Sequence, residues 1–256
     1  MPDAEEAPLG SPTLRVCALY PDLMNIYADR GNLLMLERRC RWRGIGFALT
    51  SSGLGEPLDA DAHDLFYLGG GQDRDQRLCA QDLIETKSES LHSAAARDAV
   101  VLGVCGGYQL LGHSYTLGGQ TIEGVGLLDV RTVRGDARRL IGNVAIEVRL
   151  DDADVDAGRV LAGFENHGGR TTLGESASAL GRVLSGHGND GRSGLEGARS
   201  ANTIGTYLHG PLLPKNAWFA DWLIARALRI DRAELAPLDD RLEDEAHLSA
   251  RHAAGL

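Results

Sequence analysis

This sequence has few lysines and lacks several patterns that would assign it to a familiar class of protein. Only Lys87 and Lys215 are lysines, so arginine carries nearly all of the positive charge. The cysteines form no C-x-x-C pair, which excludes the usual spacing of a zinc site and gives no sign of a disulfide framework. We therefore expect free thiols and no metal site.

Long apolar runs are also missing. No stretch approaches the roughly twenty residues that cross a membrane as a helix. The segment 1–12 is acidic and contains proline, unlike a secretory signal. A formal net charge of -10 argues against broad binding to nucleic acid or to an acidic membrane surface. These absences predict a cytoplasmic protein without membrane insertion, whose partners are small molecules or other proteins.

Nucleotide-binding signatures are absent as well. The pattern G-x-x-x-x-G-K-[ST] does not occur, and Gly69, Gly70 and Gly71 lack the G-x-G-x-x-G spacing of dinucleotide-binding turns. We therefore expect no nucleotide and no other cofactor to be bound by this chain.

Strands and helices alternate through the first half of the sequence. Apolar runs predict strands, and the amphipathic stretches between them predict helices. The strands are expected at 14–20, 45–50, 65–68 and 100–104, and the helices at 33–43, 76–87 and 88–97. This alternation predicts an α/β fold with a mostly parallel, doubly wound sheet. The length of 256 residues suits one such domain.

The second half of the sequence is rich in predicted strands. They are expected near 125–133, 143–150, 160–164, 183–185 and 203–208, and we expect them to extend the sheet. A turn-rich loop is predicted at 186–197 and a helix at 218–228. We divide the chain into a disordered leader at 1–12, a single domain at 13–230 and a C-terminal helix or tail at 231–256.

The stretch VVLGVCGGYQLLG, at 100–112, places Cys105 between a predicted strand and a predicted helix. One interpretation is structural, because a small buried cysteine flanked by glycines allows close packing. The other is a nucleophile elbow, in which a tight turn exposes a reactive thiol at the start of a helix. There the helix dipole favours the thiolate, and the Gly106 N–H can stabilise an oxyanion.

A thiolate nucleophile needs a base and an oxyanion hole. His209 follows an apolar stretch and precedes a Gly-Pro break, which makes it our first candidate for the base. His167 is the rival, and we expect His113 to be structural. Backbone N–H groups of Gly70 or Gly71 could complete the oxyanion hole, because glycines at the end of a strand let amides face a ligand.

The combination of segments resembles the class I glutamine amidotransferases. GVCGGYQ at 103–109 matches their cysteine elbow, YLHG at 207–210 matches their catalytic histidine, and GGG at 69–71 matches their glycine loop. The resemblance implies a single amidotransferase domain with a flavodoxin-like, mostly parallel sheet extended by antiparallel strands, and helices on both faces. It also implies that Cys105 attacks the side-chain amide of L-glutamine and that water later releases glutamate from a thioester.

Within that family the chain is most similar to the cobyric acid synthase type, and among these to the glutaminase subunits of lipid II isoglutaminyl synthases. The segments that carry this likeness are NIYADRGN, LGGGQDRDQ, RRLIG, FENHGGRT and GTYLHGPLLPKN. The resemblance implies a heterodimer with a Mur-ligase-like subunit. That partner would hold ATP and Mg²⁺ and use the ammonia to amidate D-glutamate of lipid II during peptidoglycan synthesis.

Two other functions stay open. The chain could supply ammonia to another acceptor, such as a cobalamin precursor, or it could be a catalytically silent subunit that holds a ligase in shape. Residues that fit glutamine binding are Arg139 for the α-carboxylate, Gln109 as a pocket support, and Asn166 and His167 as pocket or interface positions.

One departure from the family concerns the third member of the catalytic triad. Many class I enzymes place a glutamate two residues after the histidine, and this chain has Pro211 there. A pair of Cys105 and His209 could suffice, or an acid could come from elsewhere in the fold. Our hypothesis is that the partner contributes it.

Overall fold

The computed structural model describes residues 11–25, 30–117, 119–134, 138–150 and 158–256. Most of the predicted leader at 1–12 therefore lies outside the described residues. The main sheet has six strands in the order β13-β14-β4-β3-β1-β2. These are β1 (Thr13–Leu19), β2 (Gly46–Ser52), β3 (Leu65–Leu68), β4 (Val100–Val104), β13 (Ala198–Ser200) and β14 (Thr203–Thr206).

All neighbouring strands of this sheet are parallel except β13, which pairs antiparallel with β14. The order of the parallel strands along the chain is that of a flavodoxin-like sheet. The predicted fold class, a mostly parallel sheet with an antiparallel extension, is confirmed. In such a sheet, ligands bind outside the carboxyl ends of the strands.

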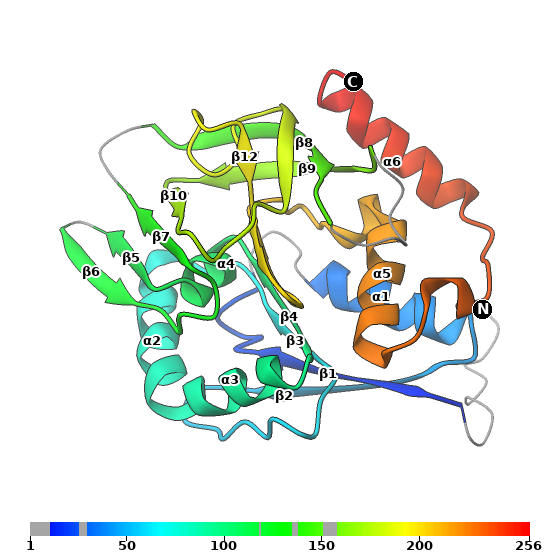
Figure 1. The fold of residues 1–256 in the computed structure, drawn as a ribbon, viewed down its shortest axis with the longest axis horizontal. Helices are drawn as coiled ribbons and strands as arrows, with labels where there is room; N and C mark the ends of the chain where they lie inside the picture. The colour runs from blue at the N-terminus through cyan, green and yellow to red at the C-terminus, as the bar shows by residue number, and fades with distance from the viewer. Residues whose placement is uncertain (1–10, 26–29, 118, 135–137, 151–157) are drawn as a thin grey trace.

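Helices cover both faces of the main sheet (Figure 1). One face packs against α1 (Arg30–Arg41) and α5 (Ala217–Leu228), and the other against α2 (Asp73–Asp82), the π-helical turn η1 (Leu83–Lys87) and α3 (Ser88–Ala96). The strands explain this division, because successive side chains point to opposite faces. In β1, for example, Val16 and Ala18 belong to the first core cluster, while Cys17 and Leu19 belong to the second.

Most of the later strands do not extend the main sheet, and that expectation was wrong for them. They form two further sheets of four strands each, ordered β10-β7-β5-β6 and β12-β11-β8-β9. Their strands are β5 (Ser114–Leu117), β6 (Gln120–Glu123), β7 (Val130–Val133), β8 (Leu140–Val148), β9 (Val160–His167), β10 (Arg170–Leu173), β11 (Gly181–Ser185) and β12 (Leu195–Glu196). Apolar alternation predicts that a segment is a strand, but it does not identify the neighbour with which that strand pairs.

The C-terminal segment contains the turns η2 (Leu213–Lys215) and η3 (Arg232–Glu234) and the helix α6 (Arg241–Ala253). No residue of α6 is buried, although Asn143 of β8 donates a hydrogen bond to the last carbonyl of α6. Arg39 of α1 is completely buried and pairs with Asp221 of α5 and with Asp240. This ion pair network ties α1, α5 and the start of α6 together. None of the helices in the described residues has the length and apolar character needed to cross a membrane.

Candidate active site

Cys105 lies in a strained turn between β4 and the short helix α4 (Gly106–Leu111). Its backbone has φ of 54° and ψ of -104°, a region that residues other than glycine rarely adopt. The backbone is held there by hydrogen bonds from Cys105 N–H to Thr206 O and from Gly107 N–H to Gly69 O. This geometry is the strand-turn-helix elbow predicted for the segment, and such strain is characteristic of functional sites.

Gly107 allows the elbow to lie directly against the end of β3. A Cβ atom at Gly107 would lie 2.1 Å from Leu68 O, a distance that no real Cβ adopts. We therefore expect Gly107→Ala to lower the free energy of unfolding by about 1–3 kcal/mol and to lower activity, because the turn must move. Urea unfolding tests this expectation. Gly142→Ala is the matched control, because nothing lies within 4 Å of a Cβ added there; an equal loss in both variants would contradict the explanation.

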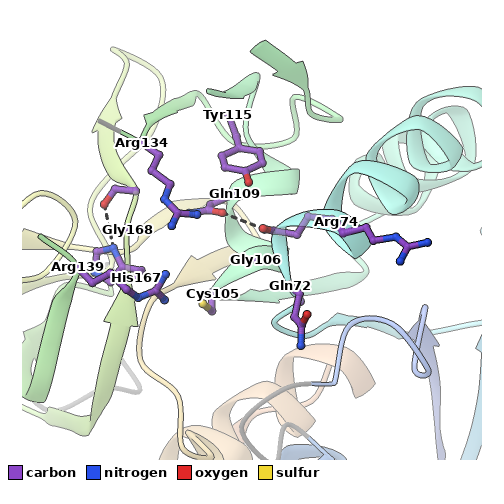
Figure 2. Close-up of a pocket in the computed structure, with 13 residues that line it drawn as sticks. Gln72, Arg74, Cys105, Gly106, Gln109, Tyr115, Arg134, Arg139, His167 and Gly168 are labelled. Carbon is purple, nitrogen blue, oxygen red and sulfur yellow. Dashed lines mark hydrogen bonds between the residues drawn. The ribbon is translucent and has the colours of Figure 1, made fainter. Parts of the chain in front are cut away.

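A pocket with a volume of about 370 Å³ opens beside the elbow (Figure 2). Its lining comes from the elbow, from the segment between β3 and α2 together with the start of α2, and from the β-rich half of the chain. The lining residues are Gly71, Gln72, Arg74, Gln76, Cys105, Gly106, Gln109, Tyr115, Arg134, Arg139, His167, Gly168 and Gly169. Residues from both halves of the sequence therefore meet around Cys105.

The charged side chains that line this pocket are arginines. Arg134 and Arg139 lie on the same side as His167, whereas Arg74 points away from them (Figure 2). Arg139 donates hydrogen bonds to the side-chain oxygen of Asn166 at 2.8 Å and to its backbone carbonyl at 2.6 Å. No carboxylate is among the described lining residues. The pocket therefore favours an anionic group such as an α-carboxylate.

Two of the three glycines predicted as oxyanion donors line the pocket. Gly71 and Gly106 both line it, and a Cβ built on Gly106 would lie 3.0 Å from Gly71 N. The two backbones are thus adjacent next to Cys105. Gly70 is not among the lining residues. Of the two glycines considered from the sequence, Gly71 is the one that the structure brings beside Gly106.

His209 lies three residues beyond Thr206, whose carbonyl accepts the Cys105 N–H. Its backbone is fixed to Phe164 of β9 by hydrogen bonds in both directions, at 2.9 and 3.1 Å. The side chain is buried, and burial, followed by the nearby His167, lowers the pKa of His209 to about 4. Its imidazole is therefore neutral near pH 7 and able to accept a proton.

His167 differs from His209 because it lines the pocket itself. Its ring is stacked on Tyr207 with centroids 3.6 Å apart and planes 3° apart. Its Nδ1 donates to the Gly169 carbonyl at 3.0 Å, and its Nε2 lies 3.7 Å from the Glu165 carboxylate. The His167 ring is thus held by three neighbours, Tyr207, Gly169 and Glu165.

Two buried carboxylates lie in this region, Glu165 beside His167 and Glu196 at the backbone of Tyr207, and both are held by backbone donors. Glu165 accepts hydrogen bonds from the N–H groups of His187 and Gly188 at 2.6 and 2.9 Å. Glu196 accepts one from Tyr207 N–H at 2.6 Å, and burial raises its pKa to about 8. The position two residues after His209 is Pro211. Sequence reasoning singled out neither glutamate.

The other cysteines of the chain differ from Cys105 in exposure. Cys17, Cys40 and Cys79 are buried, whereas Cys105 is partly exposed at the pocket. Burial raises the pKa of Cys17 to about 11 and those of Cys40 and Cys79 to about 12, so these thiols are inert near neutral pH. In the described part of the chain, no group of three His, Cys, Asp or Glu residues is arranged to hold a metal ion.

Several pocket residues were not predicted from the sequence. Arg134 and Tyr115 were missed, and so was Gln76, whose side-chain amide donates to Gln109 Oε1 at 2.9 Å. Arg134 is one of many arginines, and its segment contains no motif that distinguishes it. Gln109 lines the pocket as expected, whereas Asn166 lies behind Arg139 and is not among the lining residues.

Comparison with known structures supports the fold. The chain superposes on PurLQS from Thermotoga maritima with a TM-score of 0.59 at 18% identity, covering 92% of this chain and 98% of that one. A glutamine amidotransferase from the same organism gives a TM-score of 0.52 at 19% identity, with 94% of each chain covered. At these identities the likeness concerns the fold alone.

Sequence comparison identifies the family. The chain is 38% identical to the Streptococcus pneumoniae protein named lipid II isoglutaminyl synthase (glutamine-hydrolyzing) subunit GatD, over 84% of this chain and 81% of that one. It is 36% identical to the Staphylococcus aureus protein of the same name, over 93% of each chain. The family model of the CobB/CobQ-like glutamine amidotransferase domain matches residues 15–217. The chain therefore belongs to the CobB/CobQ-like glutamine amidotransferases.

Proposed function

We propose that this chain is a glutaminase subunit that hydrolyses L-glutamine at Cys105 and delivers the ammonia to an ATP-dependent, Mur-ligase-like partner. The observation that carries the glutaminase step is the placement of Cys105, in a strained elbow at the wall of an arginine-lined pocket. The other thiols are buried, so Cys105 is the thiol that a small substrate can reach.

Glutamine binding is assigned to the arginine side of the pocket. The α-carboxylate of glutamine pairs with Arg139, whose guanidinium is oriented by Asn166. Such charge-assisted pairs favour a fixed orientation of the carboxylate. The side-chain amide then extends toward Cys105, between the Gly106 N–H and the Gly71 N–H.

The proposed chemistry proceeds in two stages, formation of a thioester and its hydrolysis. Cys105 Sγ attacks the carboxamide carbon, and its proton passes to His209. The developing oxyanion accepts hydrogen bonds from Gly106 N–H and Gly71 N–H, an arrangement in which one donor contributes roughly a hundredfold or more in rate. His209 returns the proton to the departing nitrogen, so ammonia leaves and a thioester remains. His209 then takes a proton from water, which attacks the thioester, and returns it to Cys105 Sγ as the C–S bond breaks, so glutamate leaves and the free thiol is restored.

We propose lipid II as the acceptor, with D-glutamate of its stem peptide amidated to D-isoglutamine by the partner. The match to the Staphylococcus aureus GatD subunit covers 93% of that protein. The match to the cobyric acid synthase of Methylorubrum populi covers only 41% of that enzyme. The identity to the two GatD subunits, 38% and 36%, is also higher than the 33% identity to that cobyric acid synthase, and this similarity supports lipid II over a cobalamin precursor as the acceptor. ATP and Mg²⁺ then belong to the partner.

The acid that orients His209 is proposed to come from the partner. Pro211 occupies the position where many class I amidotransferases carry a glutamate, and Glu165 and Glu196 are already held by backbone N–H groups. An acid supplied across the interface would couple glutamine hydrolysis to complex formation. We expect the isolated chain to hydrolyse glutamine much more slowly than the complex; equal rates would contradict this part of the proposal.

The acceptor is tested by co-purifying the partner and supplying lipid II, ATP and glutamine. Mass spectrometry of the stem peptide is expected to show the loss of about one mass unit that accompanies conversion of a carboxyl group to an amide. A Cys105→Ala complex should still amidate lipid II when free ammonia is provided at high pH. Amidation of a corrinoid precursor and not of lipid II would favour the cobalamin alternative.

Arg139 offers a prediction about substrate affinity. Arg139→Ala removes the cation assigned to the α-carboxylate, so KM for glutamine is expected to rise by about 10-fold to 100-fold, with a smaller change in kcat. Steady-state glutaminase assays on the complex measure both constants. Arg138→Ala is the matched control, because this neighbouring arginine does not line the pocket. An equal rise in KM for both variants would show a nonspecific effect of positive charge.

A further inference from the structure

A chain of buried hydrogen bonds runs from the pocket into the β-rich half of the protein. Gln76 Nε2 donates to Gln109 Oε1 at 2.9 Å, and Gln109 Nε2 donates to the Tyr207 hydroxyl at 3.1 Å. That hydroxyl lies 2.6 Å from Thr171 Oγ1, which in turn lies 2.7 Å from Thr132 Oγ1. All five side chains are buried. The chain of bonds joins α2, α4 and the end of β14 to the strands β10 and β7.

These bonds fix the orientation of the Gln109 carboxamide. Its oxygen accepts from Gln76, and one of its two N–H bonds points to the Tyr207 oxygen. Because Tyr207 accepts there, its own proton is available to Thr171. Gln109 keeps a second N–H beyond these bonds, and its side chain lines the pocket.

The ring of Tyr207 holds a second pocket residue. It is stacked on the imidazole of His167, with centroids 3.6 Å apart, and the same ring meets Tyr108 edge-on at 5.1 Å. Tyr207 is itself buried and does not line the pocket. Its direct contacts with residues that line the pocket are those with Gln109 and His167.

Gly169 leaves the space that this arrangement requires. A Cβ atom built there would lie 2.6 Å from Gln109 Nε2 and 3.0 Å from the Tyr207 hydroxyl. Gly169, which lines the pocket, therefore lies directly against the hydrogen-bonded side chains of Gln109 and Tyr207. The Gln109 amide is constrained by Gly169 as well as by its hydrogen bonds.

We propose that Tyr207 is a positioning residue for glutamine binding, whose hydroxyl sets the Gln109 carboxamide and whose ring holds the His167 imidazole, so that both present fixed groups to the substrate. This inference rests on the proposed glutaminase function. It assigns to the tyrosine of the segment TYLHG a role separate from that of His209 two residues later.

The test is the concentration dependence of Cys105 alkylation by the diazo-ketone analogue of L-glutamine, followed by mass spectrometry on the full chain with its co-purified partner. Tyr207→Phe keeps both ring contacts and removes the hydroxyl. We expect the half-saturating concentration to rise about tenfold, the cost of leaving one buried partner unsatisfied. The maximal alkylation rate should change less than about twofold. Alkylation by iodoacetamide, which does not use the glutamine pocket, should be unchanged.

Tyr108→Phe is the matched control, because it removes a buried hydroxyl bonded to Asn189 from the neighbouring ring. Tyr108→Phe should lower the melting temperature as Tyr207→Phe does, but it should not change the half-saturating concentration of the analogue. Two variants of Thr171 test its hydrogen bond with the Tyr207 hydroxyl. Thr171→Val should weaken binding of the analogue, and Thr171→Ser, which keeps a hydroxyl, should bind it as wild type does.

The outcomes separate this inference from the proposed function. If Tyr207→Phe leaves half-saturation unchanged, or if Tyr108→Phe shifts it equally, Tyr207 has only a structural role and the inference is overturned. If the analogue fails to label the wild-type chain while iodoacetamide labels it, the glutaminase proposal fails and this inference fails with it.

Discussion

Cys105→Ala is expected to abolish glutamine hydrolysis, with a loss on the order of 10⁴-fold or more in kcat. Without the thiol, no thioester forms, and the remaining oxyanion donors and binding groups retain only a small part of the acceleration. The fold should survive, because the strained backbone at Cys105 is imposed by hydrogen bonds of Cys105 N–H and Gly107 N–H and not by the thiol. Steady-state assays of the complex measure the loss.

The control for this variant is Cys79→Ala. Cys79 is buried on α2, where burial raises the pKa of its thiol to about 12. Its replacement should cost some stability and leave kcat within about twofold of wild type, because this cysteine lies away from the pocket lining. A comparable loss of activity in both variants would mean that Cys105 matters for packing and not for catalysis.

His209→Asn is expected to lower kcat by about a hundredfold to ten-thousandfold, the usual contribution of a general acid-base residue. His167→Asn should lower activity less, because the proposed mechanism gives the proton transfer to His209 and leaves His167 at the pocket wall. His113→Asn is the control, since this histidine lies outside the pocket beside Asp129. A larger loss from His167→Asn than from His209→Asn would reverse the assignment of the base.

The same histidine predicts a pH dependence of folding. The pKa of His209 is lowered from 6.5 to about 4 in the folded chain. Between these values the unfolded chain binds more protons at this position, so stability rises with pH across that window and this contribution is complete above pH 6.5. The free energy of unfolding should be compared between wild type and His209→Asn across this pH range. The variant should lose this part of the increase in stability with pH. For the isolated chain, the acid limb of kcat/KM should likewise lie well below pH 6.5.

The main sheet could be predicted from the sequence because its signals are local. The strands β3 and β4 are short, fully buried apolar runs, and the predicted bounds of both agree with the structure. The β5-β6 hairpin at 114–123 was not predicted, and only Val130–Val133 of the segment predicted at 125–133 is a strand. The division of the later strands among separate sheets depends on long-range pairing, which periodicity does not encode.

The site could be predicted only where a motif marks it. Cys105, Gly106 and Gln109 fall in one short segment, and the structure places all three at the pocket. Tyr207 and Thr171 are 36 positions apart in the chain and meet only after folding. No motif or fixed spacing in the sequence marks this contact. The series of hydrogen-bonded side chains behind the pocket therefore cannot be recognised from one sequence.

The central claim is that Cys105 is the nucleophile of a glutamine pocket. The most direct measurement is mass-spectrometric mapping of the residue modified by the diazo-ketone analogue of L-glutamine, on the isolated chain and again with its co-purified partner. We predict modification of Cys105 alone among the four cysteines, with protection by excess glutamine. Absence of labelling at Cys105 in both preparations would contradict the account and leave Cys105 as a packing residue.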